Sequence, residues 1–408
     1  MTPLTIDRLG AKGDGLADGP DGPVAVAFTL PGEQVVGAIA DGRIDAPRIL
    51  TPSQDRVRAP CPHFRQCGGC MVQHASDALV ENWKGDQVVA ALARHGIEAG
   101  RPRVDTSPPQ SRIRATLSGR RTKKGALVGF HGRGSDQIVP ITDCTVLHPD
   151  ILSAMPVLTE LTIRLAARKG AVQMAVSRSD NGLDVDLSGG KPLDAAMVAT
   201  LSTLAGAAGV VRLSHMGDVI AQHAAPVQTF GPARVVPPPG AFLQATEHGR
   251  DALVAFAETS LAGAAVVADL FCGVGTFALP LARSAEIAAF EADSAMIAAL
   301  DLAGRMTDGL KPVVATARDL FRRPLMAEEL ARFDGVLLDP PRAGAAAQVA
   351  ELAKSTVPCL VYVSCNPVTF ARDAAVLQAG GYQLQGLLVV DQFRWSPHVE
   401  LAASFRRI

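Results

Sequence analysis

Apolar and polar positions alternate over short runs at the start of the chain, up to residue 58. The runs span residues 4–9, 24–30, 35–39 and 43–50, and turn signals such as Pro31-Gly32 and Asp41-Gly42 separate them. Short alternating runs with closely spaced turns are typical of a small antiparallel barrel. We therefore predict an OB-like barrel over residues 1–58.

Two features divide the rest of the chain. Apolar residues from Leu79 to Leu92 recur near the 3.6-residue helical spacing, and Gly96 ends the helix predicted over residues 78–95. Farther along, a Pro-rich stretch over residues 235–240 predicts a hinge. We expect a central domain of mixed helices and strands over residues 59–236 and a C-terminal domain over residues 237–408.

Strands and helices alternate in the C-terminal domain. Strands are predicted over residues 264–271, 286–291, 313–315, 335–338 and 360–364, with helical segments between them. This alternation predicts a doubly wound, mostly parallel α/β sheet of the Rossmann-like type, which binds ligands at the carboxyl ends of its strands. Residues 383–391 and 399–406 lack an intervening helix, so we expect an antiparallel pair at one sheet edge.

The first strand of this domain leads into a glycine-rich loop. Gly273 and Gly275 allow a tight turn and a close approach of the backbone to a ligand, and Thr276 follows in the same loop. Glu291 ends the next strand and offers a carboxylate to two ribose hydroxyls. The pattern suits NAD as well as S-adenosylmethionine, and a tight turn without a ligand is the alternative.

Two later strand ends carry polar side chains. Asp339 precedes two prolines, and Arg342 stands where amino-methyltransferases place an aromatic residue, which argues against amine methylation. Cys365 follows the next strand, directly before Asn366, an expected N-cap, and Pro367. Because a helix N-terminus favours the thiolate, we predict that Cys365 is a nucleophile.

The last predicted strand offers a candidate acid or base. His398 and Glu400 are two positions apart and would share one face of the strand, and a solvated surface pair is the alternative. Cys272 and Cys359 lie in or beside apolar runs, so we predict that they pack in the core.

Four other cysteines form a separate group. Cys61, Cys67 and Cys70 lie close together in sequence, and Cys144 follows much farther along the chain. Thiolates at this spacing suit a tetrahedral zinc ion or an iron–sulfur cluster, and the spacing alone does not choose between them. Four unliganded thiols are the remaining alternative.

The composition limits which binding partners and which cellular compartment we expect for the protein. Lys and Arg number 39 against 40 Asp and Glu, so no overall basic field favours a nucleic acid. With 48% hydrophobic and 19% charged residues the chain is a folded globular protein. It has neither an apolar run of membrane-spanning length nor an apolar signal-peptide core, and its 7 cysteines are unevenly clustered. We expect a reducing, cytoplasmic location without membrane contact.

Basic residues nevertheless gather over residues 101–133, where Asp105 precedes a run without acids up to Arg133. The candidate RNA contacts in this segment are Arg112, Arg114, Arg120, Arg121, Lys123, Lys124 and Arg133. A local concentration of cations is what binding to a phosphate backbone requires. Solvated loop charge is the alternative.

Four ordered motifs resemble the RNA uracil-5-methyltransferase family, which acts on tRNA and 23S rRNA. They are Phe271-Cys272-Gly273, Asp339-Pro340-Pro341-Arg342, Ser364-Cys365-Asn366-Pro367 and His398-Val399-Glu400. The resemblance covers nearly the whole chain and implies a TRAM domain at the barrel. It further implies an S-adenosylmethionine site lined by Gln244, Phe271, Glu291, Asp319 and Asp339.

The resemblance also bears on the cysteine group and on the substrate. It implies that Cys61, Cys67, Cys70 and Cys144 hold a [4Fe-4S] cluster, and the cluster together with a TRAM domain looks more like the 23S rRNA enzymes than the tRNA enzymes. Thr276 and Thr246 stand where the family commonly has Asn, and Thr lacks the amide.

The expected reaction is methyl transfer from S-adenosylmethionine to C5 of a uridine in structured RNA, with 23S rRNA as the expected substrate. Cys365 adds to C6 of the base and Glu400 removes the C5 proton. No obligate protein partner is evident in the sequence. A tRNA substrate, an NAD-dependent oxidoreductase and an RNA-binding protein without catalysis are the alternatives.

Overall fold

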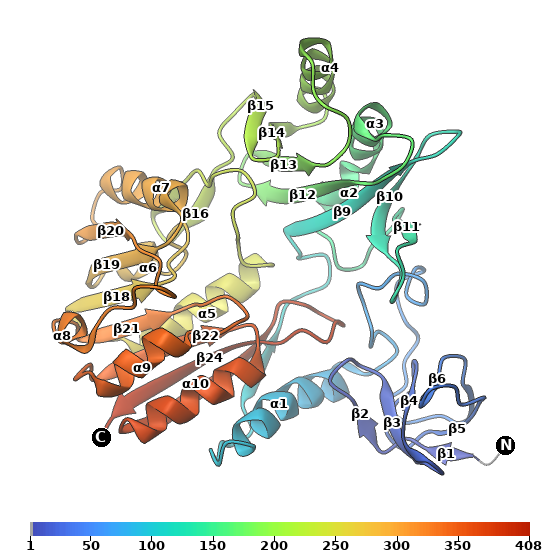
Figure 1. The fold of residues 1–408 in the computed structure, drawn as a ribbon, viewed down its shortest axis with the longest axis horizontal. Helices are drawn as coiled ribbons and strands as arrows, with labels where there is room; N and C mark the ends of the chain where they lie inside the picture. Colours follow the sequence, from blue (N-terminus) through green and yellow to red (C-terminus); the bar gives the residue numbers. More distant parts are fainter. Residues whose placement is uncertain (1–2) are drawn as a thin grey trace.

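The computed structural model describes residues 3–408 of the chain. Figure 1 separates a group of short N-terminal strands at the lower right, a central sheet at the upper right and a large C-terminal sheet at the left.

Two small sheets form the N-terminal part, with strand orders β1-β5-β7 and β2-β3-β4-β6. Their strands are β1 (Leu4–Thr5), β2 (Arg8–Leu9), β3 (Gly15–Gly19), β4 (Gly22–Val26), β5 (Gln34–Val36), β6 (Arg43–Ile44) and β7 (Arg48–Thr51). All neighbours are antiparallel except β4 and β6. Ile6, Val24, Val26, Val35 and Ile44 form a shared apolar core. The short strands agree with the sequence pattern, whereas the OB-like barrel stays a prediction.

The predicted helix after the cysteine segment is present as α1 (Asp77–Ala93). Ser76 caps it by accepting a hydrogen bond from Leu79 N at 3.2 Å. The buried face of α1 contributes Val88 and Leu92 to the core beneath the C-terminal sheet. α1 therefore lies against the C-terminal domain, although its residues fall within the expected central domain.

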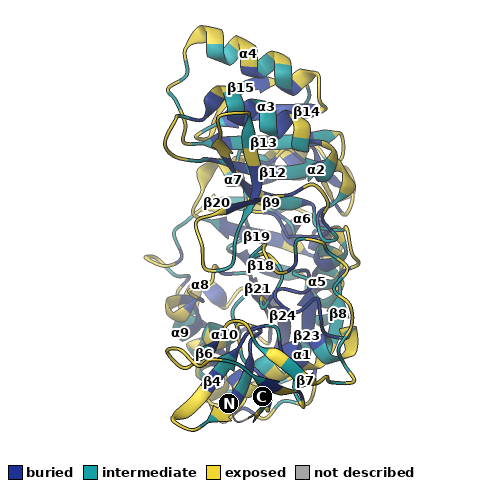
Figure 2. Ribbon diagram, turned by 90° about the vertical axis from the view of Figure 1, so that its right-hand side faces the viewer, coloured by how far each residue is buried: buried dark blue, intermediate teal, exposed yellow. Residues whose placement is uncertain are grey.

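The central sheet has the strand order β11-β10-β9-β12-β13-β14-β15. Its strands are β9 (Arg114–Arg121), β10 (Ala126–His131), β11 (Ile138–Pro140), β12 (Val172–Ser179), β13 (Gly182–Ser188), β14 (Val210–His215) and β15 (Asp218–Gln222). Its helices are α2 (Pro149–Ser153), α3 (Met155–Leu165) and α4 (Ala195–Gly206). Figure 2 shows that α4 at the top of the molecule presents an exposed face, while β14 beneath it is mostly buried. The short pair β16 (Gln228–Phe230) and β17 (Ala233–Val235) leads to the Pro-rich stretch.

The C-terminal sheet has the strand order β20-β19-β18-β21-β22-β24-β23-β8. Its strands are β8 (Arg103–Thr106), β18 (Val266–Leu270), β19 (Glu286–Glu291), β20 (Val313–Ala317), β21 (Gly335–Leu338), β22 (Cys359–Ser364), β23 (Tyr382–Asp391) and β24 (Glu400–Arg407). Its helices are α5 (Glu247–Ser260), α6 (Ala278–Leu281), α7 (Ser294–Arg305), α8 (Ala327–Leu330), α9 (Ala346–Lys354) and α10 (Pro367–Ala379). The run from β20 to β22 is parallel, which confirms the doubly wound prediction.

The antiparallel pair predicted at the sheet edge is present as β23 and β24, but it is not the edge. β24 lies between β22 and β23, and β8 pairs in parallel with the outer side of β23. No sequence pattern indicated β8, because a four-residue strand from a distant segment has no periodicity of its own. The domain boundary at residue 236 stays a prediction.

The strand order of this sheet reverses direction at β18, whose neighbours are β19 on one side and β21 on the other. β21 and β22 are buried throughout, as parallel strands covered on both faces should be. Cys272 and Cys359 are buried in the same core, as predicted. The carboxyl ends of β18, β19, β21 and β22 therefore open one crevice at the reversal point.

The helices found in residues 3–408 are all too short or too polar to span a bilayer.

Candidate functional site

The loop after β18 turns sharply at the crevice. Phe271 has φ +63° and Gly273 φ +53°, and a Cβ added at Gly273 would point into open space. At Gly275, φ is +92° and a Cβ would lie 2.4 Å from Leu300 Cδ1, so only glycine fits. The loop thus leaves Gly273 open to a ligand and packs Gly275 against α7.

Glu291 and Asp319 follow the next two strands. Glu291 accepts hydrogen bonds from Gly273 N at 3.3 Å and from Ala292 N at 2.6 Å, so its carboxylate bridges the two strand ends. Asp319 accepts from Phe321 N at 3.0 Å, and the Phe321 ring packs on Phe271 with centroids 5.4 Å apart. The residues expected to hold an adenosine ligand are therefore adjacent along this edge. Thr276 is partly exposed in the same loop.

Thr246 has a local role that explains its side chain. Its hydroxyl accepts a hydrogen bond from Gly249 N at 2.9 Å and so caps α5, and it lies 2.8 Å from the Ser107 hydroxyl. Thr and Asn both serve as N-caps. The departure from the family pattern at this position therefore preserves the cap.

Two carboxyl groups of the crevice, the half-buried Asp339 and the buried Glu400, are joined by two glutamines. Gln244 donates to Asp339 Oδ2 at 3.3 Å, and Gln392 donates to Gln244 Oε1 at 2.6 Å. Gln392 Nε2 also lies 3.2 Å from Glu400 Oε2. Asp339 and Glu400 are thus linked by amides that hold each other in place.

Burial sets the protonation of both acids. It raises the pKa of Asp339, and burial together with the charge of Asp339 raises the pKa of Glu400 to about 8. Two buried carboxyl groups this close do not both ionise readily. Glu400 therefore has a pKa near the range in which a general base works.

The residues Cys365 and Glu400 adjoin the last pair of the antiparallel strands β22 and β24. Ser364 pairs with Leu401, so the positions just beyond that pair, Cys365 and Glu400, lie opposite each other. Asn366 caps α10 by accepting from Val368 N at 3.1 Å, as predicted, with Pro367 in the first turn. The nucleophile predicted from one strand end and the base predicted from another thus share one crevice.

The expected thiolate preference of Cys365 is wrong for the unliganded chain. Burial raises the pKa of the Cys365 thiol to about 11, and the charges of Glu400 and Asp339 contribute to this rise, while Arg342 opposes it. Desolvation and two carboxylates outweigh the helix N-terminus. The thiol form therefore prevails until a substrate or a proton acceptor changes its surroundings.

The structure also departs from the prediction that His398 and Glu400 share one face of the last strand. β24 begins at Glu400, and His398 precedes it in an irregular segment. Glu400 is buried in the crevice, whereas His398 is exposed and lines a neighbouring cavity. The two side chains therefore have different surroundings.

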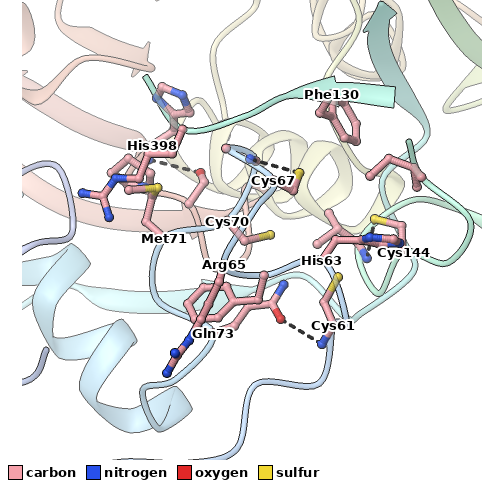
Figure 3. A pocket seen from close by; sticks show the side chains of 18 of the residues that line it. Cys61, His63, Arg65, Cys67, Cys70, Met71, Gln73, Phe130, Cys144 and His398 are labelled. Carbon is pink, nitrogen blue, oxygen red and sulfur yellow. Dashed lines mark hydrogen bonds between the residues drawn. The ribbon is translucent and has the colours of Figure 1, made fainter. Parts of the chain in front are cut away.

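That neighbouring cavity has a volume of about 980 Å³ and lies between the cysteine segment, the N-terminal strands and the central sheet. Cys61, Cys67, Cys70 and Cys144 all line it, and Figure 3 shows their sulfur atoms around a common space. Each is a free thiol. The structure thus brings Cys144 to the other three from a distant part of the sequence.

Backbone N–H groups point at two of these sulfur atoms. Gly69 N donates to Cys67 Sγ and Val146 N to Cys144 Sγ, both at 3.4 Å. Burial raises the pKa of Cys70 to about 12. Within the described residues, no set of three or more His, Cys, Asp or Glu side chains is arranged to hold a metal ion.

Six of the seven predicted RNA-binding residues fall into two groups. Arg120, Arg121, Lys123 and Lys124 are exposed on the hairpin of β9 and β10, which we call the basic hairpin. Arg112 and Arg114 instead face inward and line the cysteine cavity. The sequence could not separate them, because the apolar cover over the inner pair comes from residues far along the chain.

The inner arginines stack on aromatic rings. The Arg114 guanidinium lies 4.4 Å from the centre of the Phe242 ring, and that of Arg112 lies 5.4 Å from the Phe393 ring. Burial lowers the pKa of Arg114 to about 10, while the charge of Glu400 opposes the shift. Arg133 contacts Phe28 at 5.2 Å and pairs with Asp14 of the N-terminal part. These cations connect the three parts of the molecule around the cavity.

Sequence reasoning missed Gln392 and the buried pair of Lys84 with Asp391. Gln392 has no motif signal, since one glutamine before an irregular segment looks like surface. Lys84 follows Trp83 in a predicted helix, and only a buried partner reveals that it is not solvated.

Three comparisons place the chain among known proteins. The family model of tRNA (Uracil-5-)-methyltransferase matches residues 253–407. An uncharacterized RNA methyltransferase of Brucella suis is 44% identical over 400 residues, covering 98% of this chain and 96% of the relative. The 23S rRNA (uracil(1939)-C(5))-methyltransferase RlmD of Pectobacterium atrosepticum is 30% identical over 421 residues, covering 98% and 93%.

One solved structure has the same fold along nearly the whole chain. The tRNA (uracil-54, C5)-methyltransferase of Pyrococcus abyssi, in complex with S-adenosyl-L-homocysteine, superimposes with a TM-score of 0.76 at 22% identity and covers 99% of this chain and 100% of its own. The solved structure shows the fold, and the identity to the curated relatives over nearly their full length establishes the family. The chain belongs to the RNA (uracil-5-)-methyltransferase family and is an enzyme of that class.

Proposed function

We propose that the enzyme transfers a methyl group from S-adenosylmethionine to C5 of a uridine in 23S rRNA through a covalent bond between Cys365 and C6 of the base. The observation that carries this proposal is the position of Cys365 opposite Glu400, beside the buried acids and amides of the crevice. A thiol facing a carboxyl group of raised pKa suits covalent catalysis followed by proton removal.

The crevice has groups suited to the methyl donor. S-Adenosylmethionine supplies the methyl group when it is bound. Gly273 gives an adenosine ligand open access to the backbone, and Glu291 offers a carboxylate for the ribose hydroxyls. Gln244 and Asp339 lie between this loop and Glu400, where they would orient the reacting end of the donor.

The chain's own residues supply the remaining steps. Cys365 gives its proton to solvent, and the thiolate Sγ forms a bond to C6 while the C5–C6 double bond opens into an enolate. C5 would then take the methyl group as the bond between that methyl and the sulfonium sulfur breaks, which leaves S-adenosylhomocysteine. Glu400 accepts the C5 proton, the C5–C6 double bond re-forms, and the bond from Sγ to C6 breaks to release the thiolate. The base must leave its stack to reach Cys365, which is least costly for an unpaired uridine.

The RNA would bind across two surfaces. The basic hairpin carries exposed cations for phosphates, and Arg112 and Arg114 lie between the cysteine cavity and the crevice.

We choose 23S rRNA because RlmD, the relative whose name states an rRNA target, matches 98% of this chain at 30% identity. The tRNA enzyme shares the fold at lower identity and leaves tRNA as the second candidate.

We further propose that Cys61, Cys67, Cys70 and Cys144 hold a [4Fe-4S] cluster as a structural tie. The four thiols line one cavity, and N–H groups aimed at sulfur stabilise thiolate ligands. In a cubane each iron binds one cysteine, so the sulfurs stand farther apart than around one shared zinc ion.

Methyl transfer to defined RNAs tests the function. Purified enzyme with radiolabelled S-adenosylmethionine should label one uridine of 23S rRNA that carries no native modifications. tRNA should stay unlabelled. Label in tRNA alone would make tRNA the substrate in place of 23S rRNA, and label in neither RNA would reject the proposed function.

The iron content tests the cluster. Anaerobically purified protein should be brown with about four irons per chain. Colourless protein carrying zinc would reject the cluster.

A further inference from the structure

Lys84 is a buried cation that bonds to a segment near the far end of the chain. Its side chain and that of Asp391 are both fully buried, and Lys84 Nζ lies 2.5 Å from Asp391 Oδ1. Nζ also donates to Phe393 O at 3.2 Å and His398 O at 2.9 Å. An ammonium group has three N–H donors, so these contacts use all of them.

Such a pair is not explained by stability alone. Removing an ammonium and a carboxylate from water is costly, and apolar residues of the same volume often stabilise a fold as well or better. What an apolar pair could not do is hold two backbone carbonyls at fixed points. Lys84 therefore defines the path of residues 391–398, which connect β23 to β24.

The residue between two of these fixed points is Gln392. Asp391 and Phe393 flank it, and Asp391 Oδ1 also accepts from Phe393 N at 3.1 Å. Gln392 Oε1 accepts from Ala245 N at 2.8 Å, and its Nε2 donates to Gln244 and Glu400. The contacts of Lys84 thus extend, through one residue of backbone on each side, to the carboxyl group of Glu400.

The middle of the segment is held by residues just after Cys70. Met71 N and Val72 N both donate to Trp395 O, at 2.7 and 3.1 Å, and Trp395 has φ +61°. A bulky residue with positive φ needs surrounding contacts to persist. These contacts fix the middle of the segment, whereas Lys84 fixes both sides of Gln392.

We infer that Lys84 is a positioning residue for the reaction: it holds Gln392 so that the carboxyl group of Glu400 stays within reach of the C5 proton. The inference rests on the proposed function and names a residue for one of its steps. Cys365 lies at the start of α10, outside the contacts of Lys84, so addition to C6 does not depend on it. Loss of Lys84 should slow proton removal and leave the earlier steps intact.

The test variant is Lys84→Met combined with Asp391→Asn. It removes both charges and the bond between the two side chains at nearly constant volume, and it leaves an amide oxygen to accept from Phe393 N. The donors to the two carbonyls are lost. We expect kcat to fall roughly 10- to 100-fold while kcat/KM for RNA stays nearly unchanged, because only a step after formation of the covalent complex is slowed. A covalent complex with unmodified RNA, stable to denaturing electrophoresis, should accumulate, because methylated base remains attached to Cys365.

A matched control carries the same changes at another buried pair. Arg212 bonds Asp184 at 2.9 and 2.6 Å between β13 and β14. The variant Arg212→Met with Asp184→Asn should lower the thermal midpoint without accumulation of the covalent complex. If the Lys84 variant behaves like this control, the inference is overturned.

A second variant decides the matter if the first does not fold. Gln392→Met breaks the link to Glu400 without altering the buried pair and should accumulate the same covalent complex. Release of RNA by this variant at the wild-type rate would also overturn the inference. Wild-type enzyme that forms no 5-methyluridine in any RNA would reject the proposed function itself, which is a separate outcome.

Discussion

The crevice of the C-terminal sheet and the basic hairpin of the central sheet differ in how far their charged groups are exposed to solvent. In the crevice Glu400 is buried and Asp339 is half-buried, and Gln244 and Gln392 donate hydrogen bonds to them. On the hairpin the cations stay exposed to solvent. Bond making requires desolvated groups whose pKa values have moved, whereas phosphate binding requires cations that exchange counterions with salt. Changes in the two regions should therefore have different consequences.

The largest effect is expected at the nucleophile. Cys365→Ala should reduce methylation by a factor on the order of 10⁴ or more, because no bond to C6 forms. The covalent complex with RNA that contains 5-fluorouridine should also be lost, which gel electrophoresis measures directly. Cys359→Ala, a buried cysteine of the same domain that packs in the core, is the matched control and should retain the complex. Methylation by Cys365→Ala at the wild-type rate would contradict covalent catalysis.

Glu400→Gln should affect a later step. Addition and methyl transfer proceed, but the C5 proton stays, so product formation should fall roughly 10²- to 10⁴-fold while a methylated covalent complex builds up. Gel electrophoresis of labelled RNA follows the complex. Normal turnover without this complex would assign the base to water or to His398, which stands two residues before Glu400 in the sequence.

The raised pKa of Glu400 predicts a pH dependence of release. Burial and the charge of Asp339 raise this pKa to about 8, so the carboxylate fraction grows as the pH rises toward that value. Decay of the covalent complex should accelerate about tenfold per pH unit below the pKa and level off above it. Asp339→Asn removes the neighbouring charge and should move the profile to lower pH. A profile unchanged in that variant would show that the two acids do not interact.

The smallest effect is expected on the basic hairpin. Replacing Arg120, Arg121, Lys123 and Lys124 with Gln should weaken RNA binding and reduce the steepness of its salt dependence by roughly one for each phosphate that is no longer neutralised. The affinity for S-adenosylmethionine should not change, because the hairpin lies in a different sheet. Titrations at several salt concentrations measure both. An unaltered salt slope would mean that these charges are only solvated.

Features that depend on a few neighbouring residues were predictable from the sequence. The alternation of strands and helices after residue 260, the turn at Gly273 and Gly275 and the cap at Asn366 all appear as expected. Backbone conformation and apolar periodicity act over one or two turns of chain, so the local sequence carries them. The same holds for the grouping of Asp339 and Cys365 at strand ends, since parallel strands present their carboxyl ends at one edge.

Only the tertiary structure decided the electrostatics and the long-range links. Lys84 and Asp391 are 307 residues apart, and Gln392 acquires its role solely from Gln244 and Glu400. The direction of the Cys365 pKa shift depends on burial and on two carboxylates from other strands, which outweigh the adjacent helix N-terminus. The sequence alone therefore determined which chemical groups are present and which turns present them, and the packing determined their pKa values and partners, because desolvation depends on everything that surrounds a side chain.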